Sequence, residues 1–305
     1  MKIAVVGAGV MGCIYGGPLS VDNDVLLVDV VRAHIDAINE NGLELQDADG
    51  TLHVYKRARA TDNTELCQPV DLLILLCKGY QTESALSANR ALIGPNTIIL
   101  SLQNGYGNAD EIVKFVPEGQ IVLGTSAHGG IMERPGHVFH AGKGPTHLGC
   151  LTVDQSKAEL AAKLFTDAGI EDVELTPNVK ELVWSKLFVN CGINPVTALL
   201  DDTNQCVANN EFARRAAAAL VKEAVDVANA AGMSFDYDAV FENVITVALG
   251  TGPNRSSMLA DVSNKRRTEV DRINGAIVAE ARKLGREAPA NETVTSLIHA
   301  KEQLY

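Results

Sequence analysis

Residues 2–12, Lys2-Ile3-Ala4-Val5-Val6-Gly7-Ala8-Gly9-Val10-Met11-Gly12, decide the fold. An apolar stretch runs directly into the pattern G-x-G-x-x-G, which predicts a buried strand, a tight turn and the start of a helix. Glycines there permit the turn, close approach of the backbone to a pyrophosphate, and close helix–strand packing. A turn that binds no ligand is the alternative. Asp29 follows the next apolar stretch, where a carboxylate can accept hydrogen bonds from an adenosine ribose, so dinucleotide binding is the favoured interpretation.

The first half of the chain alternates apolar stretches with helical ones. The predicted strands after the first are Val25–Val28, Leu72–Cys77, Thr97–Leu102 and Ile121–Gly124, and the predicted helices between them include Arg32–Asn41 and Gln81–Leu92. This alternation is typical of βαβ units and of a parallel sheet covered on both faces. Gly136–His140 and Pro145–Gly149 are predicted to form an antiparallel pair.

From Pro177 onward the periodicity is helical. We predict helices at Asn178–Leu200, Asn210–Ala231, Tyr237–Leu249, Ser263–Leu284 and Asn291–Gln303. The chain is therefore expected to form an α/β Rossmann-type dinucleotide-binding domain over residues 1–176 and an all-helical substrate domain over residues 177–305. A substrate cleft between the two domains is implied.

Composition excludes several classes of protein. The 305 residues include 26 Lys and Arg against 38 Asp and Glu, and a formal charge of −12 argues against nucleic acid and anionic membranes as partners. No apolar run approaches the roughly 18 residues that span a bilayer. The six Cys form no CxxC pattern, so we expect no metal site or disulfide framework, but a reduced, cytoplasmic protein. The apolar helices are compatible with a homodimer, which we expect over a monomer.

Two polar residues end apolar strands of the first domain. Lys78 and Asn104 follow the strands predicted at Leu72–Cys77 and Thr97–Leu102, and ligands of open α/β sheets bind beyond the carboxyl ends of strands. Both residues are therefore candidates for the cofactor crevice. An exposed strand-end lysine and a turn asparagine before Gly105 are the equally valid alternatives.

A helical face in the second half carries three polar residues. Lys186, Asn190 and Asn194 recur at i, i+4 and i+8 among largely apolar neighbours, and buried polar groups without partners cost about 1–3 kcal/mol each. A substrate carbonyl, hydroxyl or carboxylate would satisfy them, and a solvated stripe or an interhelical network is the alternative. Glu269, at the edge of an apolar stripe, is either an ion-pair partner or a cleft residue.

Eight short segments together suggest a family. They are Gly7–Gly12, Cys77–Gln81, Gln103–Gly105, Gly124–His128, Trp184–Leu187, Asn190–Pro195, Ser256–Asp261 and Arg267–Gly275. In their order and spacing the chain resembles the ketopantoate reductase (2-dehydropantoate 2-reductase) family over essentially its whole length. The resemblance implies a Rossmann-type domain followed by a helical domain like that of the 6-phosphogluconate dehydrogenase superfamily.

The same resemblance implies roles for individual residues. It makes Lys186 the general acid and, with Glu269, a candidate catalytic residue. The implied substrate-binding residues are Lys78, Asn104, Asn190, Asn194, Asn204 and Ser257. The implied cofactor-binding residues are Gly7, Ala8, Gly9, Val10, Met11, Gly12, Lys78, Asn104, Gly130 and Glu269, which join Asp29. Two positions depart from the family pattern: Asp29 lies where members that use NADPH carry a basic residue, and Arg255 lies where the family is usually uncharged.

The expected activity is reduction of a small 2-keto acid, ketopantoate to D-pantoate, with NADH favoured by Asp29 and NADPH as the family default. A D-2-hydroxyacid dehydrogenase acting on branched or aromatic 2-keto acids is the main alternative. A 3-hydroxyacyl-CoA-type dehydrogenase would need a His–Glu pair that the sequence does not place. The polar face around Lys186 argues against a non-catalytic NAD(H)-sensing module.

Overall fold

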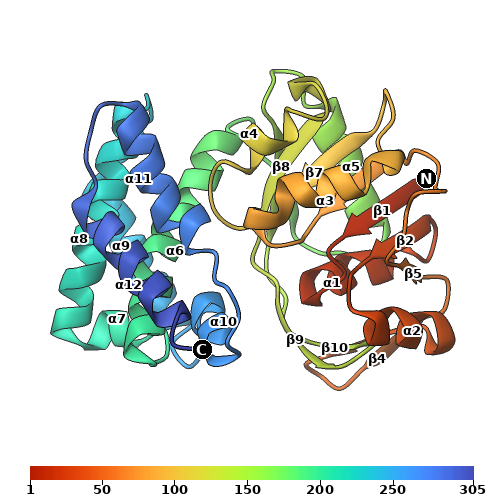
Figure 1. The fold of residues 1–305 in the computed structure, drawn as a ribbon, viewed down its shortest axis with the longest axis horizontal. Helices are drawn as coiled ribbons and strands as arrows, with labels where there is room; N and C mark the ends of the chain where they lie inside the picture. Colours follow the sequence, from red (N-terminus) through yellow and green to blue (C-terminus); the bar gives the residue numbers. More distant parts are fainter. The chain divides into compact units, whose positions relative to one another are not determined.

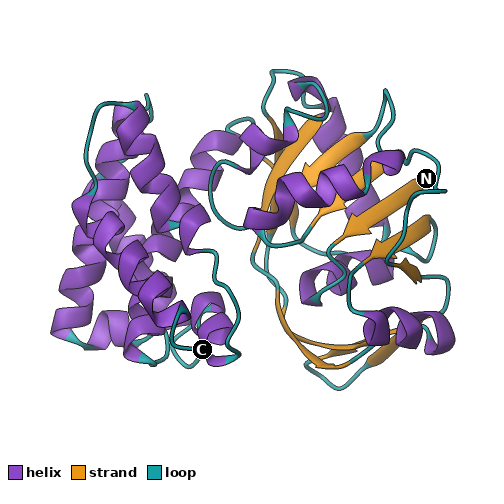
Figure 2. Cartoon of the chain, viewed as in Figure 1, coloured by secondary structure: helices purple, strands orange, loops and turns teal.

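A computed structural model describes all of residues 1–305, and its elements fall into two units. The first unit comprises Met1–Gln103 and Asn108–Leu182, and the second comprises Asn104–Gly107 and Val183–Tyr305. Strands occur only in the first unit, as Figure 2 shows. The division thus lies after Leu182, where the sequence predicted it after Thr176, and the Asn104–Gly107 loop belongs with the helices.

The first unit is built on an eight-stranded sheet of order β12-β11-β8-β7-β6-β1-β2-β5 (Figure 1). Its strands are β1 (Lys2–Val6), β2 (Asp24–Val28), β5 (Arg59–Thr61), β6 (Leu72–Leu75), β7 (Ile98–Ser101), β8 (Ile121–Ser126), β11 (Thr146–Cys150) and β12 (Val173–Leu175). Neighbouring strands pair parallel, except for the antiparallel pair of β8 and β11. The predicted α/β class with a parallel sheet is confirmed.

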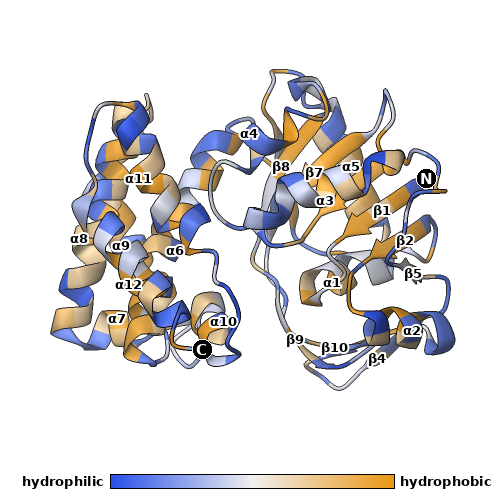
Figure 3. Cartoon of the chain, in the orientation of Figure 1, coloured by the Kyte–Doolittle hydropathy of each residue, from blue (hydrophilic) through white to orange (hydrophobic).

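Helices cover both faces of this sheet. They are α1 (Val10–Leu19), α2 (Arg32–Asn41), α3 (Thr82–Ala88), α4 (Asn108–Ile112), α5 (Ser156–Asp167) and the short 3₁₀ turns η1 (Gly79–Gln81), η2 (Arg90–Leu92) and η3 (Glu118–Gln120). Val5 of β1 shares a core cluster with Phe165 of α5, whereas its neighbour Val6 shares another with Leu86 of α3. Because successive side chains of a strand point to opposite faces, strands buried on both sides read as continuous apolar runs, and they appear orange in Figure 3.

A smaller sheet corrects one prediction. Its strands are β3 (Leu43–Asp47), β4 (Leu52–Tyr55), β9 (Gly129–Arg134) and β10 (His137–Gly142), in the order β4-β3-β10-β9. The pairing predicted between Gly136–His140 and Pro145–Gly149 is wrong, since β10 pairs with β9 and β3, while β11 pairs with β8 and β12. The chain crosses from one sheet to the other between Gly142 and Thr146, where the sequence pattern suggested a hairpin turn.

The second unit is wholly helical apart from its loops. Its elements are α6 (Val179–Leu200, which begins in the first unit), α7 (Cys206–Asn209), α8 (Glu211–Ala230), α9 (Tyr237–Gly250), α10 (Ser257–Ser263), η4 (Val270–Arg272), α11 (Asn274–Lys283) and α12 (Pro289–Glu302). The side chain of Asn210 caps α8 by accepting from the Phe212 and Ala213 amides, and that of Asp236 caps α9. Trp184 and Phe188 of α6 lie fully buried in the core of this unit. None of the helices is long and apolar enough to span a membrane.

The helix predicted over Ser263–Leu284 is wrong. The structure ends α10 at Ser263, passes through an irregular segment with the single turn η4, and starts α11 at Asn274. Lys265 adopts a positive φ of 53°, which a continuous helix does not allow. Glu269 therefore lies in a bent segment and not on the flank of a helix.

Candidate active site

The glycine loop has the geometry of a phosphate cradle. Gly7 adopts φ of +96°, and a Cβ there would lie 2.3 Å from the Cys77 nitrogen; a Cβ on Gly12 would lie 2.2 Å from the Gly7 carbonyl oxygen. By contrast, a Cβ on Gly9 would meet nothing within 4 Å, so there is open space in front of the loop. Gly9 precedes α1, which has neither a side-chain cap nor an acidic residue in its first turn. Amides at the start of such a helix favour an anion, so the residues present fit a dinucleotide pyrophosphate.

Asp29 directly follows β2, beside this loop. The amides of Gly7 and Ala8 both donate to the Val28 carbonyl oxygen, at 2.9 and 3.2 Å, which ties the loop to the end of β2. Oδ1 of Asp29 accepts from the amides of Val30 and Val31, at 2.8 and 3.0 Å. These bonds fix the orientation of the carboxylate through Oδ1. Asp29 thus lies at the carboxyl end of β2 beside the glycine loop, and its role as a ribose acceptor stays a prediction.

Gly130 lies close to the loop although it comes from the smaller sheet. A Cβ on Gly130 would lie 2.7 Å from the Phe139 carbonyl oxygen and 2.9 Å from Cγ1 of Val10. Only glycine therefore lets β9 pack this closely on the first turn of α1. The two stretches predicted to border the cofactor, Gly7–Gly12 and Gly129–Gly130, are neighbours in the first unit.

The loop that carries Lys78 is held by a buried glutamine, Gln103, which sequence reasoning did not single out. Lys78 is half-buried and precedes η1, beyond the end of β6. Nε2 of Gln103 donates to the carbonyl oxygen of Cys77 and to Oγ1 of Thr82, both at 2.9 Å, while its Oε1 accepts from Ser101. Gln103 thus ties the end of β7 to the loop that carries Lys78.

In the second unit, α6 carries Lys186, Asn190 and Asn194 at helical spacing, as predicted. Lys186 and Asn190 are half-buried and Asn194 is only 6% exposed. Nδ2 of Asn194 lies 3.4 Å from Oγ of Ser257. Burial lowers the pKa of Lys186 from 10.5 to about 8, while the charge of Glu269 acts in the opposite direction. Lys186 is therefore a stronger acid than an exposed lysine, and it keeps its proton at neutral pH.

Ser256 and Ser257 have separate roles. Oγ of Ser256 accepts from the Leu259 amide as the N-cap of α10 and lies 2.7 Å from Oγ1 of Thr197. Ser257, the first residue of α10, is the serine that contacts Asn194. Ser256 is therefore the N-cap of α10, whereas the Ser257 hydroxyl faces Asn194.

Asn204 presents an unpaired acceptor. Its backbone amide donates to the Asn254 carbonyl oxygen at 3.0 Å, and its Nδ2 donates to Oγ1 of Thr251 at 2.9 Å. Its side-chain Oδ1 is buried and has no hydrogen-bond partner. A buried acceptor without a partner is unfavourable, and a ligand hydroxyl would satisfy it.

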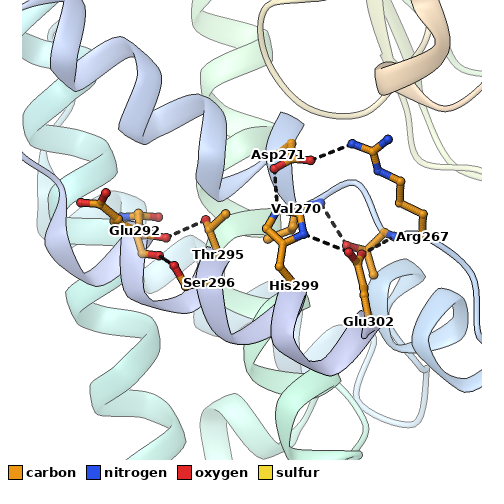
Figure 4. A network of polar contacts seen from close by, with 10 residues as sticks. Arg267, Val270, Asp271, Glu292, Thr295, Ser296, His299 and Glu302 are labelled. Atoms are coloured by element: carbon orange, nitrogen blue, oxygen red, sulfur yellow. Dashed lines mark hydrogen bonds and ion pairs between the residues drawn. The ribbon is translucent and has the colours of Figure 1, made fainter. Parts of the chain in front are cut away.

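Glu269 is 6% exposed and occupies the position before η4. The segment around it is anchored to α12, as Figure 4 shows: the Thr268 amide donates to Glu302 at 2.7 Å, and His299 contacts both Glu302 and Asp271. Asp271 also accepts from Arg267. The charge of Glu269 raises the pKa of Lys186 against the effect of burial, so the two predicted residues interact electrostatically.

The Asn104 loop packs against the same segment. Gly105 adopts φ of +86°, and a Cβ there would lie 2.3 Å from the Arg272 carbonyl oxygen. The Tyr106 amide donates to that oxygen at 2.8 Å, and the Tyr106 ring lies 4.7 Å from the ring of Trp184. Asn104 therefore belongs with the helical residues, although it follows a strand of the first unit. The predicted residues form two groups: the glycine loop, Asp29, Lys78 and Gly130 in one unit, and the remainder in the other.

The side chain of Arg255 contacts Ser263 and Asp201. One nitrogen, Nη2, lies 2.5 Å from Oγ of Ser263 and 3.6 Å from Oδ1 of Asp201. More than half of the side chain is exposed. Arg255 thus contacts the last residue of α10 and the residue that follows α6.

Two family models match most of this chain, and known proteins align over its full length. The model "Ketopantoate reductase PanE/ApbA" matches residues 3–152, and its C-terminal counterpart matches residues 178–302. The 2-dehydropantoate 2-reductase of Pyrococcus horikoshii is 35% identical, covering 100% of this chain and 98% of its own. The enzyme of the same name from Halobacterium salinarum is 34% identical, with 99% of each chain covered.

Solved structures give the same fold. A D-mandelate dehydrogenase with NADH and anilino(oxo)acetate superposes with a TM-score of 0.93 at 32% identity, covering 99% of each chain. A PanE/ApbA family ketopantoate reductase from Ralstonia eutropha superposes with a TM-score of 0.89 at 29% identity and the same coverage. The chain belongs to the ketopantoate reductase family, and it is an NAD(P)-dependent reductase with an N-terminal dinucleotide-binding domain and a helical C-terminal domain.

Proposed function

We propose that the protein reduces ketopantoate to D-pantoate with NADH. The observation that carries the proposal is the α6 face, on which an acidified Lys186 lies in line with Asn190 and Asn194. A lysine with a pKa of about 8 donates a proton far more readily than one at 10.5. Such a group is what reduction of a ketone requires when an alkoxide develops.

When bound, the reduced nicotinamide supplies the hydride to the keto carbon. Lys186 is the group that gives its proton to the carbonyl oxygen, and the desolvation that lowers its pKa also strengthens its interaction with a developing negative charge. Glu269 has the opposite effect on the pKa, because a carboxylate stabilises the ammonium form. The balance keeps Lys186 protonated and acidic near neutral pH.

The surrounding polar groups would orient the substrate. Asn190 and Asn194 offer amides on the same face as Lys186, and Ser257, within reach of Asn194, would bind the carboxylate. The unpaired Oδ1 of Asn204 would accept from a substrate hydroxyl. Ketopantoate has both a hydroxyl and a carboxylate, so this set of donors and acceptors matches its chemistry.

The same proposal includes a preference for NADH. A carboxylate at Asp29 accepts from ribose hydroxyls but repels a 2′-phosphate, and unit charges 4 Å apart at an effective dielectric of about 20 interact by about 4 kcal/mol. Screening and side-chain rotation reduce this value, and a residual of about 1.4 kcal/mol still gives a tenfold preference. The D-mandelate dehydrogenase of similar fold was solved with NADH.

A second candidate is a D-2-hydroxyacid dehydrogenase that takes branched or aromatic 2-keto acids. The similarity to D-mandelate dehydrogenase favours it, because the same lysine and asparagines would serve either substrate. We expect kcat/KM with NADH to rank ketopantoate above 2-ketoisovalerate and phenylglyoxylate. Highest efficiency with phenylglyoxylate would establish the second candidate in place of the first.

The panel also tests two other classes. A non-catalytic NAD(H)-sensing module would bind NADH and turn over no keto acid. A 3-hydroxyacyl-CoA-type dehydrogenase would act on 3-ketoacyl thioesters and would turn over none of the three 2-keto acids. The predicted homodimer and cytoplasmic location remain predictions, which light scattering and fractionation of cells test.

A further inference from the structure

Acidic side chains and one arginine lie at the carboxyl ends of β2 and β5. The two strands pair in parallel, with Val28 beside Thr61, and the Asp29 amide donates to the Thr61 carbonyl oxygen at 3.1 Å. Asp29 and Asp62 therefore leave the sheet on neighbouring strands. Arg32, the first residue of α2, lies beside them.

Both sides of the Arg32 guanidinium are occupied. Nε lies 3.0 Å from Oδ1 of Asp36, one turn further along α2, and Nη1 lies 3.4 Å from Oδ2 of Asp62. All three side chains are exposed to solvent. Asp29, at the end of the neighbouring strand, adds a third carboxylate to this region, so the place where the adenosine ribose would lie carries a formal surplus of negative charge.

This arrangement bears on cofactor choice. Dinucleotide-binding domains that accept the 2′-phosphate of NADPH use a nearby arginine. Arg32 is the arginine next to the end of β2, but a 2′-phosphate would have to compete for it with two carboxylates. NADH does not need Arg32, because its ribose hydroxyls require only a hydrogen-bond acceptor.

We propose that Asp36 and Asp62 select NADH over NADPH by holding Arg32 in two ion pairs. They act as positioning residues through Arg32, whereas Asp29 acts on the ribose directly. The proposal rests on the NADH preference proposed above and extends it to residues outside the glycine-loop motif. Exposed ion pairs change equilibria by about 1.5- to 5-fold each, so the two together account for about tenfold in selectivity.

Binding measurements without any keto acid test this proposal. Dissociation constants for NADH and NADPH are measured by calorimetry and by nicotinamide fluorescence on the full-length protein and on the double variant Asp36→Asn, Asp62→Asn. We expect the ratio of the NADPH constant to the NADH constant to fall about tenfold in the double variant. Because no substrate is used, failure of the reductase proposal would leave this result unaffected.

Two controls isolate the role of Arg32. Asp24→Asn removes a comparable surface ion pair, with Arg59, at the opposite end of the same two strands, and it should leave the ratio unchanged. Adding Arg32→Gln to the double variant should abolish the gain. An unchanged ratio in the double variant overturns the proposal, and so does a gain that persists with Arg32→Gln, which would indicate simple charge repulsion. Thermal unfolding of each variant verifies that the fold is intact.

Discussion

Replacing Glu269 by Gln should move the basic limb of the pH profile to lower pH. Burial lowers the pKa of Lys186, and the charge of Glu269 opposes this shift, so that the pKa is about 8. A carboxylate near an ammonium stabilises the protonated form, so its removal lowers the pKa, and we expect a shift of about one unit. Gln keeps the size of the side chain and removes only its charge.

The expected size of the effect depends on pH. At pH 8 about half of the wild-type Lys186 is protonated, whereas a pKa near 7 leaves about a tenth, which is roughly a fivefold loss of general acid. At pH 6 both forms are almost fully protonated, and this loss disappears. If Glu269 contacts the cofactor, the loss of that contact in Glu269→Gln would lower kcat/KM at every pH and would leave the basic limb of the pH profile in place.

The measurement is kcat/KM for ketopantoate with NADH across this range, because this parameter reports the free enzyme. Asp226→Asn is the matched control, since it neutralises an exposed carboxylate that pairs with Lys222 on α8. We expect the control profile to coincide with the wild type. A basic limb that stays in place or moves upward in Glu269→Gln would refute the assignment of that limb to Lys186.

Three further predictions concern the glycine loop, Lys186 and His128, which lies between β8 and β9. Gly9→Ala should weaken NADH binding about tenfold or more without loss of stability, because the added Cβ projects into the open space in front of the loop. Gly12→Ala should instead lower the unfolding temperature, because its Cβ meets the Gly7 carbonyl oxygen. Equal effects of the two variants on NADH binding and on unfolding temperature would contradict this. Lys186→Ala should lower kcat by about 10²–10⁴, and a change under tenfold in a folded variant would remove it from the mechanism. Burial lowers the pKa of His128 to about 4, so the unfolded state binds a proton first as pH falls below about 6.5, and roughly 1–2 kcal/mol of stability is lost on the way to pH 4. Urea unfolding of His128→Asn should show a flatter pH dependence, and an unchanged slope would argue against this origin.

The regular parts of the fold could be predicted from sequence because their signals are local. Arg32–Asn41 is predicted and observed with the same bounds, and the helix predicted over Tyr237–Leu249 differs from α9 by one residue. The smaller sheet could not be predicted in this way. Its strand β4 is mostly exposed and lacks an apolar run, and β10 pairs with β3, a strand far away in sequence, so its register depends on tertiary contacts.

The helical face that carries three candidate residues was easier to predict than the segment that carries Glu269. Lys186, Asn190 and Asn194 lie on one helix, so their spacing alone places them on a common face. Glu269 lies in a bend that Glu302 and His299 hold from α12, and an apolar stripe continuing past it suggested a helix instead. Periodicity records which residues are apolar, but it does not record a hydrogen bond to a side chain more than thirty residues away.

Three residues hold the segments that carry candidate site residues. Gln103 fixes the loop of Lys78, Thr197 contacts the cap of the helix that begins with Ser257, and Glu302 holds the segment of Glu269. Each acts on one candidate residue through a hydrogen bond to the backbone or to a cap, so none bears a chemical signature in the sequence. If substrate orientation limits the rate, conservative changes at these three positions should lower kcat without abolishing binding, because the groups that contact the ligand would remain but lose their alignment.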